Sequence, residues 1–492
     1  MRNCGLFFRG LACFSHTEGC DKEKGDDTMK TWKQLLIRHG WMLSEEERNI
    51  FDCKNETELN LQFLWECLEK AHIPFTIKGD KLILLEDIDR EESWIEALQF
   101  PSRGRGEGLW FRPGQDAPKV RELDLYISGI VRQLNRLGFY TMGSCDGHGR
   151  RTAHVMFTKD CDIETLQELL LAFGMKRVHI IERRKHYQFQ LRCSEHELLD
   201  LAEKWSQVEE SWLGEGVEYI KEHLFYRQLE QLLMIPGVSG NEGRVREYVI
   251  DRLSPYMDHL TVDNNGNVLA EKSYRNGHGP TILLNAHMDT VYELEEGRKI
   301  IKNGTVWSSS KGILGADDRA GVAVVLHLVE HLYHSSFSGK VKVIFTVEEE
   351  CGLVGASRVD DYFLWGTDGA IVVDRRGNGD IVTSCGSFLP FCHKDFGTFF
   401  EKVADEEGLS GWAATMGGSS DTRIWAGHGI QSVNVSAGYW NEHTNEETLD
   451  VAACYQTAKL LKGILKRGNE LKCIIRKINR QQPAVRNRRK AQ

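Results

Sequence analysis

The second half of the chain, from about residue 217 to 465, alternates short apolar segments with longer amphipathic ones. The apolar segments, such as TILLNAH (281–287) and GAIVVD (369–374), predict strands that are buried on both faces. Strands joined by helices run mostly parallel, because each helix carries the chain back across the sheet. Residues 217–466 are therefore predicted to form an α/β domain, with a mainly parallel mixed sheet flanked by helices.

The first half predicts different units. Between residues 121 and 205 the order is helix, strand, strand, helix, strand, strand, helix, and the first helix of each half ends in a glycine, Gly138 or Gly174. This pattern indicates an αββ repeat in a small α+β domain over 113–210. Residues 29–112 predict an N-terminal helical or α+β region of unknown role, rich in tryptophan.

Both ends of the chain read as less ordered. Residues 1–28 predict a disordered extension, because Met29 begins a more ordinary opening. The apolar run near the start is interrupted by Arg9 and predicts no signal peptide. Residues 467–492 form a basic tail, for which we expect a solvated, disordered end.

Composition narrows the classes of partner. The chain is 41% hydrophobic and 27% charged, with a net charge of −10, as expected for a soluble protein without a nucleic-acid partner. No segment has the length of a membrane span. Its 13 cysteines include no Cys-x-x-Cys pair, so the sequence favours neither a disulfide framework nor a zinc ribbon. A reducing cytoplasm fits this pattern best.

Polar side chains gather where the predicted strands of 217–466 end. Ligands of open α/β sheets bind at the carboxyl ends of the strands, so we expect these groups to converge. Alone, each histidine or aspartate would read as a hydrogen-bonded structural residue or a helix cap. Together they would repel one another unless divalent cations neutralise them, and their oxygen and nitrogen atoms suit zinc, manganese or cobalt. The residues are His287, Asp289, Asp317, Asp318, Glu348, Glu349, Glu350, Asp374 and His443.

The three consecutive glutamates in VIFTVEEECG need separate roles. Three like charges in a row need a cation nearby, and the three carboxylates are expected to divide between binding it, taking part in chemistry and lying in water. Strand alternation would place Glu348 and Glu350 on the same side if the extended backbone continues. Geometry alone therefore leaves the assignment of base and ligand open.

Five segments resemble the co-catalytic di-zinc exopeptidases, most closely the peptidase-T-like metallopeptidases, with the glutamyl and deblocking aminopeptidases as more distant relatives. They are NAHMDTV, LGADDRAG, FTVEEECGLVGA, IVVD and EHTNEETLD. The resemblance covers about the last half of the chain and not residues 1 to about 216. It implies the zinc exopeptidase fold and two divalent metal ions, zinc first, with cobalt or manganese as alternatives. It also implies five metal ligands: His287 and Asp374 on one ion, Glu350 and His443 on the other, and Asp317 bridging both.

The same resemblance assigns the remaining acids. The family pattern Glu-Glu-x-Gly, anchored here on Gly352, implies Glu349 as the general base, Glu350 as the ligand and a water between the metals as the nucleophile. Asp289 is implied to hydrogen-bond His287 and fix its tautomer. Asp318 is implied to follow Asp317 through a cis peptide bond.

The chain also departs from the family. Peptidase-T-like enzymes carry a lid domain between the aspartate ligand and the last histidine ligand, but only 69 positions separate Asp374 from His443. A domain of about 100 residues does not fit there. The sequence therefore predicts a core without a lid, and leaves the oligomeric state and the grip on a substrate carboxylate open.

Three further segments carry polar residues that could be functional or structural. Asp421, in GGSSDTRIW, is a candidate for substrate binding or a simple helix cap. Thr444-x-x-Glu447 reads as a capping box that starts a helix. The loop SCDGHGRR, with Cys145 and His148 and with His154 beyond it, is compatible with a metal or anion site, but its spacing favours a tight polar turn.

The predicted function is hydrolysis of peptide bonds in short peptides by a cytoplasmic aminopeptidase. The same metal core also serves carboxypeptidases and deacylases of N-acyl amino acids, which remain alternatives. A third hypothesis is a non-catalytic regulator that only binds peptides. Short peptides are the expected partners, with neither a membrane nor a nucleic acid.

Overall fold

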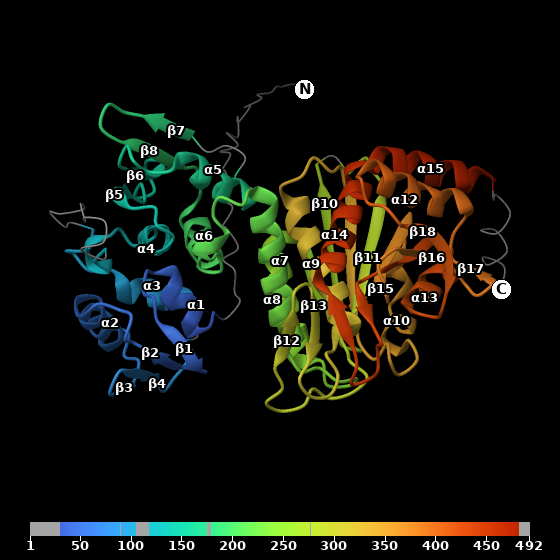
Figure 1. Ribbon diagram of the computed structural model, residues 1–492, viewed down its shortest axis with the longest axis horizontal. Coiled ribbons are helices and arrows are strands. Elements are labelled where there is room, and N and C mark those ends of the chain that lie inside the picture. Colours follow the sequence, from blue (N-terminus) through green and yellow to red (C-terminus); the bar gives the residue numbers. More distant parts are fainter. Residues whose placement is uncertain are drawn as a thin grey trace, which may run out of the picture.

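The computed structural model describes residues 30–88, 90–104, 118–173, 175, 179–275 and 277–481. The expectation of a disordered segment at 1–28 falls outside these residues, as does Gly174. Figure 1 shows two small units, in blue and teal, beside a larger unit built around a broad sheet. Each of the three units has its own buried hydrophobic cluster.

The first unit packs three helices against a four-stranded antiparallel sheet of order β1-β2-β4-β3. Trp32, Trp41 and Trp94 meet in its core, which explains the tryptophans of this region. Its elements are α1 (Trp32–Arg38), β1 (Ser44–Glu47), β2 (Ile50–Asp52), α2 (Glu58–Lys70), β3 (Phe75–Lys78), β4 (Lys81–Leu84) and α3 (Glu91–Leu98).

The second unit has the expected order of helices and strands between residues 121 and 205, and its antiparallel sheet has the order β5-β6-β8-β7. Gly138, after α4, adopts a φ of 83°, which favours glycine. The elements are η1 (Val120–Glu122), α4 (Ser128–Arg136), β5 (Thr141–Cys145), β6 (Ala153–Phe157), α5 (Ile163–Ala172), β7 (His179–Glu182), β8 (Tyr187–Leu191), α6 (Glu195–Ser206) and η2 (Glu210–Trp212).

The third unit is an α/β domain, as the alternating pattern predicts. Its nine-stranded mixed sheet has the order β17-β16-β19-β15-β11-β14-β10-β9, with β18 paired to β16. The central strands β14, β11, β15 and β19 run parallel, and antiparallel strands lie on either side. The strands are β9 (His259–Val262), β10 (Val268–Tyr274), β11 (Thr281–His287), β14 (Gly339–Thr346), β15 (Gly369–Arg375), β16 (Asp380–Cys385), β17 (Leu389–Pro390), β18 (Ala413–Gly417) and β19 (Gln431–Ser436).

Helices cover this sheet, and a second, small sheet of order β12-β13-β21-β20 accompanies it. The helices are α7 (Val217–Leu233), α8 (Gly243–Leu253), η3 (Ser254–Tyr256), α9 (Ala316–Tyr333), α10 (Val354–Ser357), α11 (Asp361–Leu364), α12 (Lys394–Glu406), α13 (Asp421–Gly427), α14 (Val451–Lys466) and α15 (Gly468–Gln481). The small sheet consists of β12 (Ile300–Asn303), β13 (Val306–Ser309), β20 (Tyr439–Trp440) and β21 (Thr448–Asp450).

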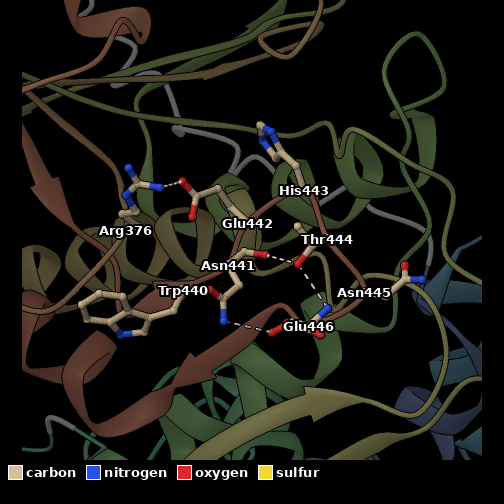
Figure 2. Close-up of a pocket in the computed structure, with 8 residues that line it drawn as sticks. All are labelled: Arg376, Trp440, Asn441, Glu442, His443, Thr444, Asn445 and Glu446. Carbon is tan, nitrogen blue, oxygen red and sulfur yellow. Dashed lines mark hydrogen bonds and ion pairs between the residues drawn. The ribbon is translucent and has the colours of Figure 1, made fainter.

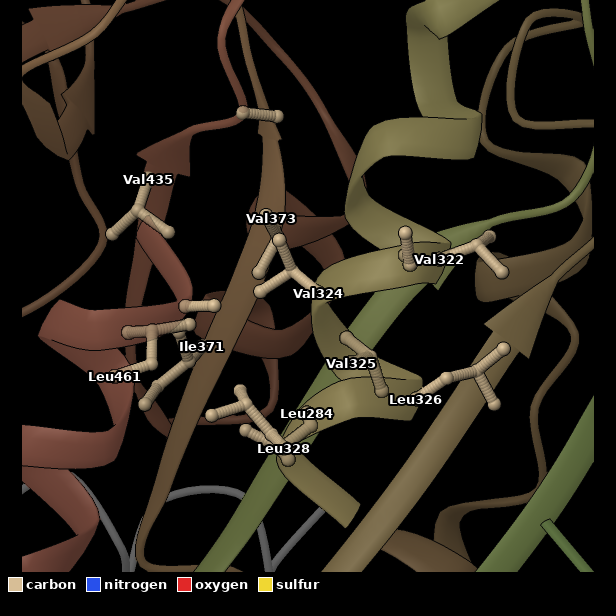
Figure 3. Close-up of a cluster of buried hydrophobic side chains, with 14 of the residues drawn as sticks. Leu284, Val322, Val324, Val325, Leu326, Leu328, Ile371, Val373, Val435 and Leu461 are labelled. Atoms are coloured by element: carbon tan, nitrogen blue, oxygen red, sulfur yellow. The ribbon is translucent and has the colours of Figure 1, made fainter. Parts of the chain in front are cut away.

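Helix α9 is the centre of the large core. The sequence predicts amphipathic helices in this unit, but this helix is buried nearly all round, because the sheet lies on one side and α7 and α14 lie on the other. Figure 3 shows Val324 and Leu328 of this helix near Ile371 and Val373 of β15. This packing fixes the start of α9 firmly against the carboxyl ends of the strands.

Three sequence expectations can be compared with this fold. The expectation of a disordered tail over 467–492 is wrong for residues 468–481, which form α15 and bury Leu471, Ile475 and Ile478 on one face. Residues 482–492 lie outside the described residues. Between Asp374 and His443, a range that the structure describes in full, strands β16 to β19 all join the large sheet, so no lid domain is inserted there. None of the described helices is long and apolar enough to cross a membrane.

Candidate metal centre

The acids and histidines converge because four parallel strands end at one edge of the sheet. Strand β11 ends on His287, β14 ends at Thr346 just before the glutamates, and β15 carries Asp374 near its end. Helix α9 brings Asp317 with its first turn, and the loop between β20 and β21 brings His443. The ends of these strands thus place His287, the glutamates and Asp374 together, and α9 and the β20–β21 loop add Asp317 and His443.

Asp317 lies between two groups of side chains. Its Oδ1 is 3.1 Å from Nε2 of His287, and its Oδ2 is 3.1 Å from Nε2 of His443. Oδ1 of Asp374 is 3.6 Å from the same nitrogen of His287, while Oε1 of Glu350 is 2.7 Å from that of His443. One carboxylate therefore faces both histidines, each of which has a second acid beside it.

The donor atoms fit divalent cations. Three sets of ligand atoms lie within 4.8 Å of one another: His287 with Asp318 and Asp374, His287 with Glu349 and Glu350, and Asp317 with Glu350 and His443. Oε1 of Glu350 is buried and makes no hydrogen bond of normal geometry to any described residue, but it forms an ion pair with Nε2 of His443, 2.7 Å away. A cation between these two atoms would bind both of them.

The pKa values of the acids and of His443 also indicate that this site favours a positive charge. Burial, followed by the charge of Asp374, raises the pKa of Glu349 to about 10. Burial also raises the pKa of Glu350 to about 7 and that of Asp374 above its ordinary value. The hydrogen bond to Asp317 raises the pKa of His443 to about 9. Burial thus favours the protonated forms of these three acids, and cations bound beside them would favour the ionised forms.

The backbone turns sharply at the glutamates. Strand β14 ends at Thr346, and Glu348 has a φ of 49°, so the extended geometry that would place Glu348 and Glu350 on one side does not continue. The N–H groups of Glu349 and Glu350 both donate to the carboxylate of Asp289, at 3.0 and 3.1 Å. The N–H of Glu348 donates instead to Glu242, at 3.3 Å. The turn thus separates Glu348 from its two neighbours.

Asp289 connects this turn to the histidine. Its Oδ1 is 3.2 Å from Nδ1 of His287, and Ser239 donates to its Oδ2 at 2.7 Å. Burial alone would raise the pKa of this acid, but the hydrogen bond from His287 outweighs it and brings the pKa of Asp289 to about 2. Asp289 therefore stays ionised and holds His287 and the glutamate turn together.

The start of α9 has an unusual backbone. The peptide bond between Asp317 and Asp318 is cis, as the resemblance implies. The carboxylate of Asp318 accepts the N–H groups of His287 and Gly321, at 3.3 and 2.9 Å. This acid ties the first turn of α9 to the end of β11.

Glu447 is a site residue to which the sequence analysis gave another role. The expectation that Thr444 and Glu447 form a capping box is wrong, because residues 448–450 form β21 and α14 begins only at Val451. Glu447 is 2% exposed, and it accepts the N–H groups of Gly315 at 2.7 Å and Asp317 at 3.0 Å. Its carboxylate is used to position the loop of Asp317 instead of a helix end.

Two other residues near Asp374 escaped sequence reasoning. The hydroxyl of Tyr439 donates to its Oδ1 at 3.0 Å, and Asn434 bonds to both its N–H and its carbonyl oxygen, at 2.9 and 2.7 Å. Asn434 interrupts the apolar strand QSVNVS, and that polar interruption was the available signal.

Asp421 is buried next to the end of β14. It is 1% exposed, begins α13 behind the cap residue Ser420, and accepts a hydrogen bond from Thr346 at the end of β14. Burial raises the pKa of Asp421 to about 6. It does not line the cavity beside His443.

That cavity has a volume of about 750 Å³ and is open to solvent. Figure 2 shows the ion pair between Arg376 and Glu442, whose nitrogen and oxygen are 2.7 Å apart, across from the ring of Trp440. The lining residues are Arg376, Trp440, Asn441, Glu442, His443, Thr444, Asn445 and Glu446. The site thus opens onto a surface with a cation, an anion and an aromatic ring.

Comparison with known proteins confirms the resemblance to co-catalytic exopeptidases. Residues 296–460, which include Asp317, Glu349, Glu350, Asp374 and His443, match the family model described as M42 glutamyl aminopeptidase. His287 and Asp289 precede the matched range. This part of the chain is therefore similar to metallo-aminopeptidases.

Individual relatives match over shorter stretches. The chain is 31% identical over 133 residues to peptidase T from Halothermothrix orenii, covering 26% of this chain and 31% of that one. It is 31% identical over 132 residues to the uncharacterized protein YqjE of Bacillus subtilis, covering 26% and 36% of the two chains. The match spans about a third of the length of these two relatives. The solved structure of aminopeptidase PepT from Bacillus cereus aligns with 50% of this chain and 98% of its own, at 18% identity and a TM-score of 0.46.

Proposed function

We propose that the unit whose residues 296–460 match the M42 glutamyl aminopeptidases removes N-terminal residues from short peptides with two divalent cations, zinc first and cobalt or manganese as alternatives. The observation that carries this proposal is the position of Asp317, with one carboxylate oxygen 3.1 Å from each of two histidine nitrogens. A carboxylate in that position can bridge two ions. His287 and Asp374 would hold one ion, and Glu350 and His443 the other.

The two cations, when bound, would polarise the scissile amide and lower the pKa of a water shared between them. The residues of the chain then supply proton transfer and position. Glu349 is next to Glu350 in the same turn, and its raised pKa, about 10 without cations, makes it a strong proton acceptor once ionised. It would take the proton of the attacking water and deliver it to the leaving amine. Asp289 keeps His287 in the tautomer that leaves Nε2 free.

The substrate would lie in the cavity beside His443. Its ion pair and Trp440, which is 47% exposed, offer contacts to the backbone and side chain of a short peptide. These contacts and the openness of the cavity favour small peptides.

The ten cysteines that the structure describes are all free, which supports a reducing cytoplasm as the location.

Cleavage of aminoacyl-4-nitroanilides, together with metal analysis, tests the proposal on the wild type and Glu349→Gln. The variant should keep its metal content and lose about 10²–10⁴-fold in kcat, because only the proton acceptor is changed. Glu348→Gln is the matched control, since its N–H bonds to Glu242 and not to Asp289; it should keep most activity. Loss of a metal ion from Glu349→Gln would instead show that Glu349 is a ligand.

N-acetylated substrates separate the alternative activities. An aminopeptidase should lose turnover when the α-amine is acetylated, whereas a deacylase would prefer the acetylated compound. A carboxypeptidase would release the C-terminal residue of unblocked peptides. Metal-loaded protein with no turnover in any of these assays would point to a peptide-binding regulator.

A further inference from the structure

A second group of metal-binding side chains lies in the second unit, outside the site described above. Cys145 ends β5, Asp146 and His148 follow in the loop to β6, and Asp124 lies about twenty positions earlier, just after η1. One sulfur, one nitrogen and two carboxylates offer ligand atoms that all lie within 4.8 Å of one another. The sequence motif contains three of these residues, and the fold adds Asp124.

Hydrogen bonds and ion pairs hold these four residues close together. The N–H of Asp146 donates to Oδ2 of Asp124 at 3.2 Å, and the thiol of Cys145 is hydrogen-bonded to the same carboxylate. Nδ1 of His148 is 3.1 Å from Oδ1 of Asp146, and its Nε2 is 3.9 Å from Oδ2 of Asp124. Both ring nitrogens of one histidine therefore lie near the two carboxylates.

The two carboxylates are buried close together. The side chains of Asp146 and Asp124 are 4% and 11% exposed, and their ion-pair partner within 4 Å, among the described residues, is His148, whose side chain is 69% exposed. The partly buried Arg103 acts on both carboxylates through its charge. Burial, with the neighbouring charge of Asp146, raises the pKa of Asp124. Two facing acids in a protein interior favour a cation between them.

We infer that Asp124, Cys145, Asp146 and His148 form a third metal site, which binds a zinc ion and ties the start of the second unit to its β5–β6 loop. A thiolate, an imidazole and two carboxylates form a mixed donor set that suits tetrahedral zinc. Zinc bonds of about 2.0–2.3 Å place ligands about 3.3–3.8 Å apart. The donor atoms lie within 4.8 Å of one another, so they need to move by about 1 Å or less to reach that spacing, and His148, whose side chain is 69% exposed, has room to move.

The thiolate gives this site a spectroscopic signature that the catalytic centre lacks. Cobalt(II) bound to a cysteine thiolate absorbs in the near ultraviolet through charge transfer from sulfur to metal, whereas nitrogen and oxygen ligands give no such band. Full-length protein loaded with cobalt should show the band, and Cys145→Ser should lose it. Cys351→Ser is the matched control, because Cys351 is the cysteine next to Glu350; it should keep the band.

Two more measurements complete the test. The wild type loaded with zinc should bind one more ion than Cys145→Ser, and His148→Ala should bind that ion more weakly while Arg150→Ala does not. Glu350→Gln should lower metal content at the catalytic centre and leave the cobalt band intact, which separates this site from the proposed peptidase. Absence of the band in the wild type, or its loss only in Cys351→Ser, would overturn the inference.

Discussion

Replacing Glu447 by glutamine should weaken metal binding although Glu447 is not a ligand. Its buried carboxylate accepts the N–H groups of Gly315 and Asp317, at 2.7 and 3.0 Å. A glutamine of the same shape has one acceptor oxygen, so its NH₂ group would face one of these two donors. One buried N–H next to Asp317 would then have no acceptor.

The size of the effect follows from that one hydrogen bond. A bond to a charged acceptor contributes about 1.5–3 kcal/mol. If this free energy is lost entirely from metal binding, through displacement of Asp317, the affinity for the metal ion falls by about 10–150-fold. Outer groups that orient metal ligands typically contribute about 10–100-fold, which agrees. Burial raises the pKa of Glu447 to about 7, so the contrast with glutamine is largest above that pH.

Zinc titration at pH 8 against a chromophoric chelator measures this prediction. Glu446→Gln is the control, since Glu446 is exposed and lines the open cavity. At saturating zinc, Glu447→Gln should recover most of its kcat, because every proposed ligand remains. Unchanged zinc affinity in this variant would refute the view that Glu447 positions the bridging acid.

Three further predictions concern other charges. Asp289→Asn should lower metal affinity about 10–100-fold, measured by the same titration, because the amide cannot accept from both His287 and the two N–H groups of the glutamate turn. Glu330→Gln should lower the melting temperature at pH 7, because it removes a partly exposed ion pair with Lys204. The loss in the free energy of unfolding should be about 1 kcal/mol or less. The pKa of Glu330 is lowered on folding, so the pair stabilises the protein fully above the ordinary glutamate pKa. The difference between the two proteins should therefore shrink progressively as the pH of the melt falls below about 4, and it is lost only when the pH falls through the lowered pKa of the folded state. Zinc affinity should rise by up to about tenfold per pH unit between pH 7 and 9, because the proton on His443, whose pKa is about 9, must leave first; isothermal titration in two buffers would count that proton.

The sequence predicts the sheet and most of the site for a physical reason. Apolar strands buried on both faces give continuous patterns, and β11 covers the residues of TILLNAH from Thr281 to His287. Because parallel strands end at one edge, the residues at their ends are brought together without further information. The positions of His287 and Asp374 needed no knowledge of side-chain contacts.

Contacts between distant segments could not be predicted in this way. Glu447 bonds to Gly315 across 132 positions, and no local pattern encodes that partner. The turn at Glu348 has a left-handed backbone that no neighbouring glycine or asparagine announces. Helix α15 was not predicted because basic residues surround its apolar ones, of which Leu471, Ile475 and Ile478 are buried, and their spacing matters only against the rest of the domain.

The acids of the site that the structure describes are of two kinds: some accept hydrogen bonds from backbone N–H groups, and others do not. Asp289, Asp318 and Glu447 each accept at least two backbone N–H groups, so they hold the chain in place. Within the described residues, Glu350 accepts no backbone N–H at its buried Oε1, which faces Nε2 of His443 at 2.7 Å, so a cation between the two side chains would bind both. Amide variants of the first kind should therefore change metal affinity through position, while Glu349→Gln should change the chemistry alone.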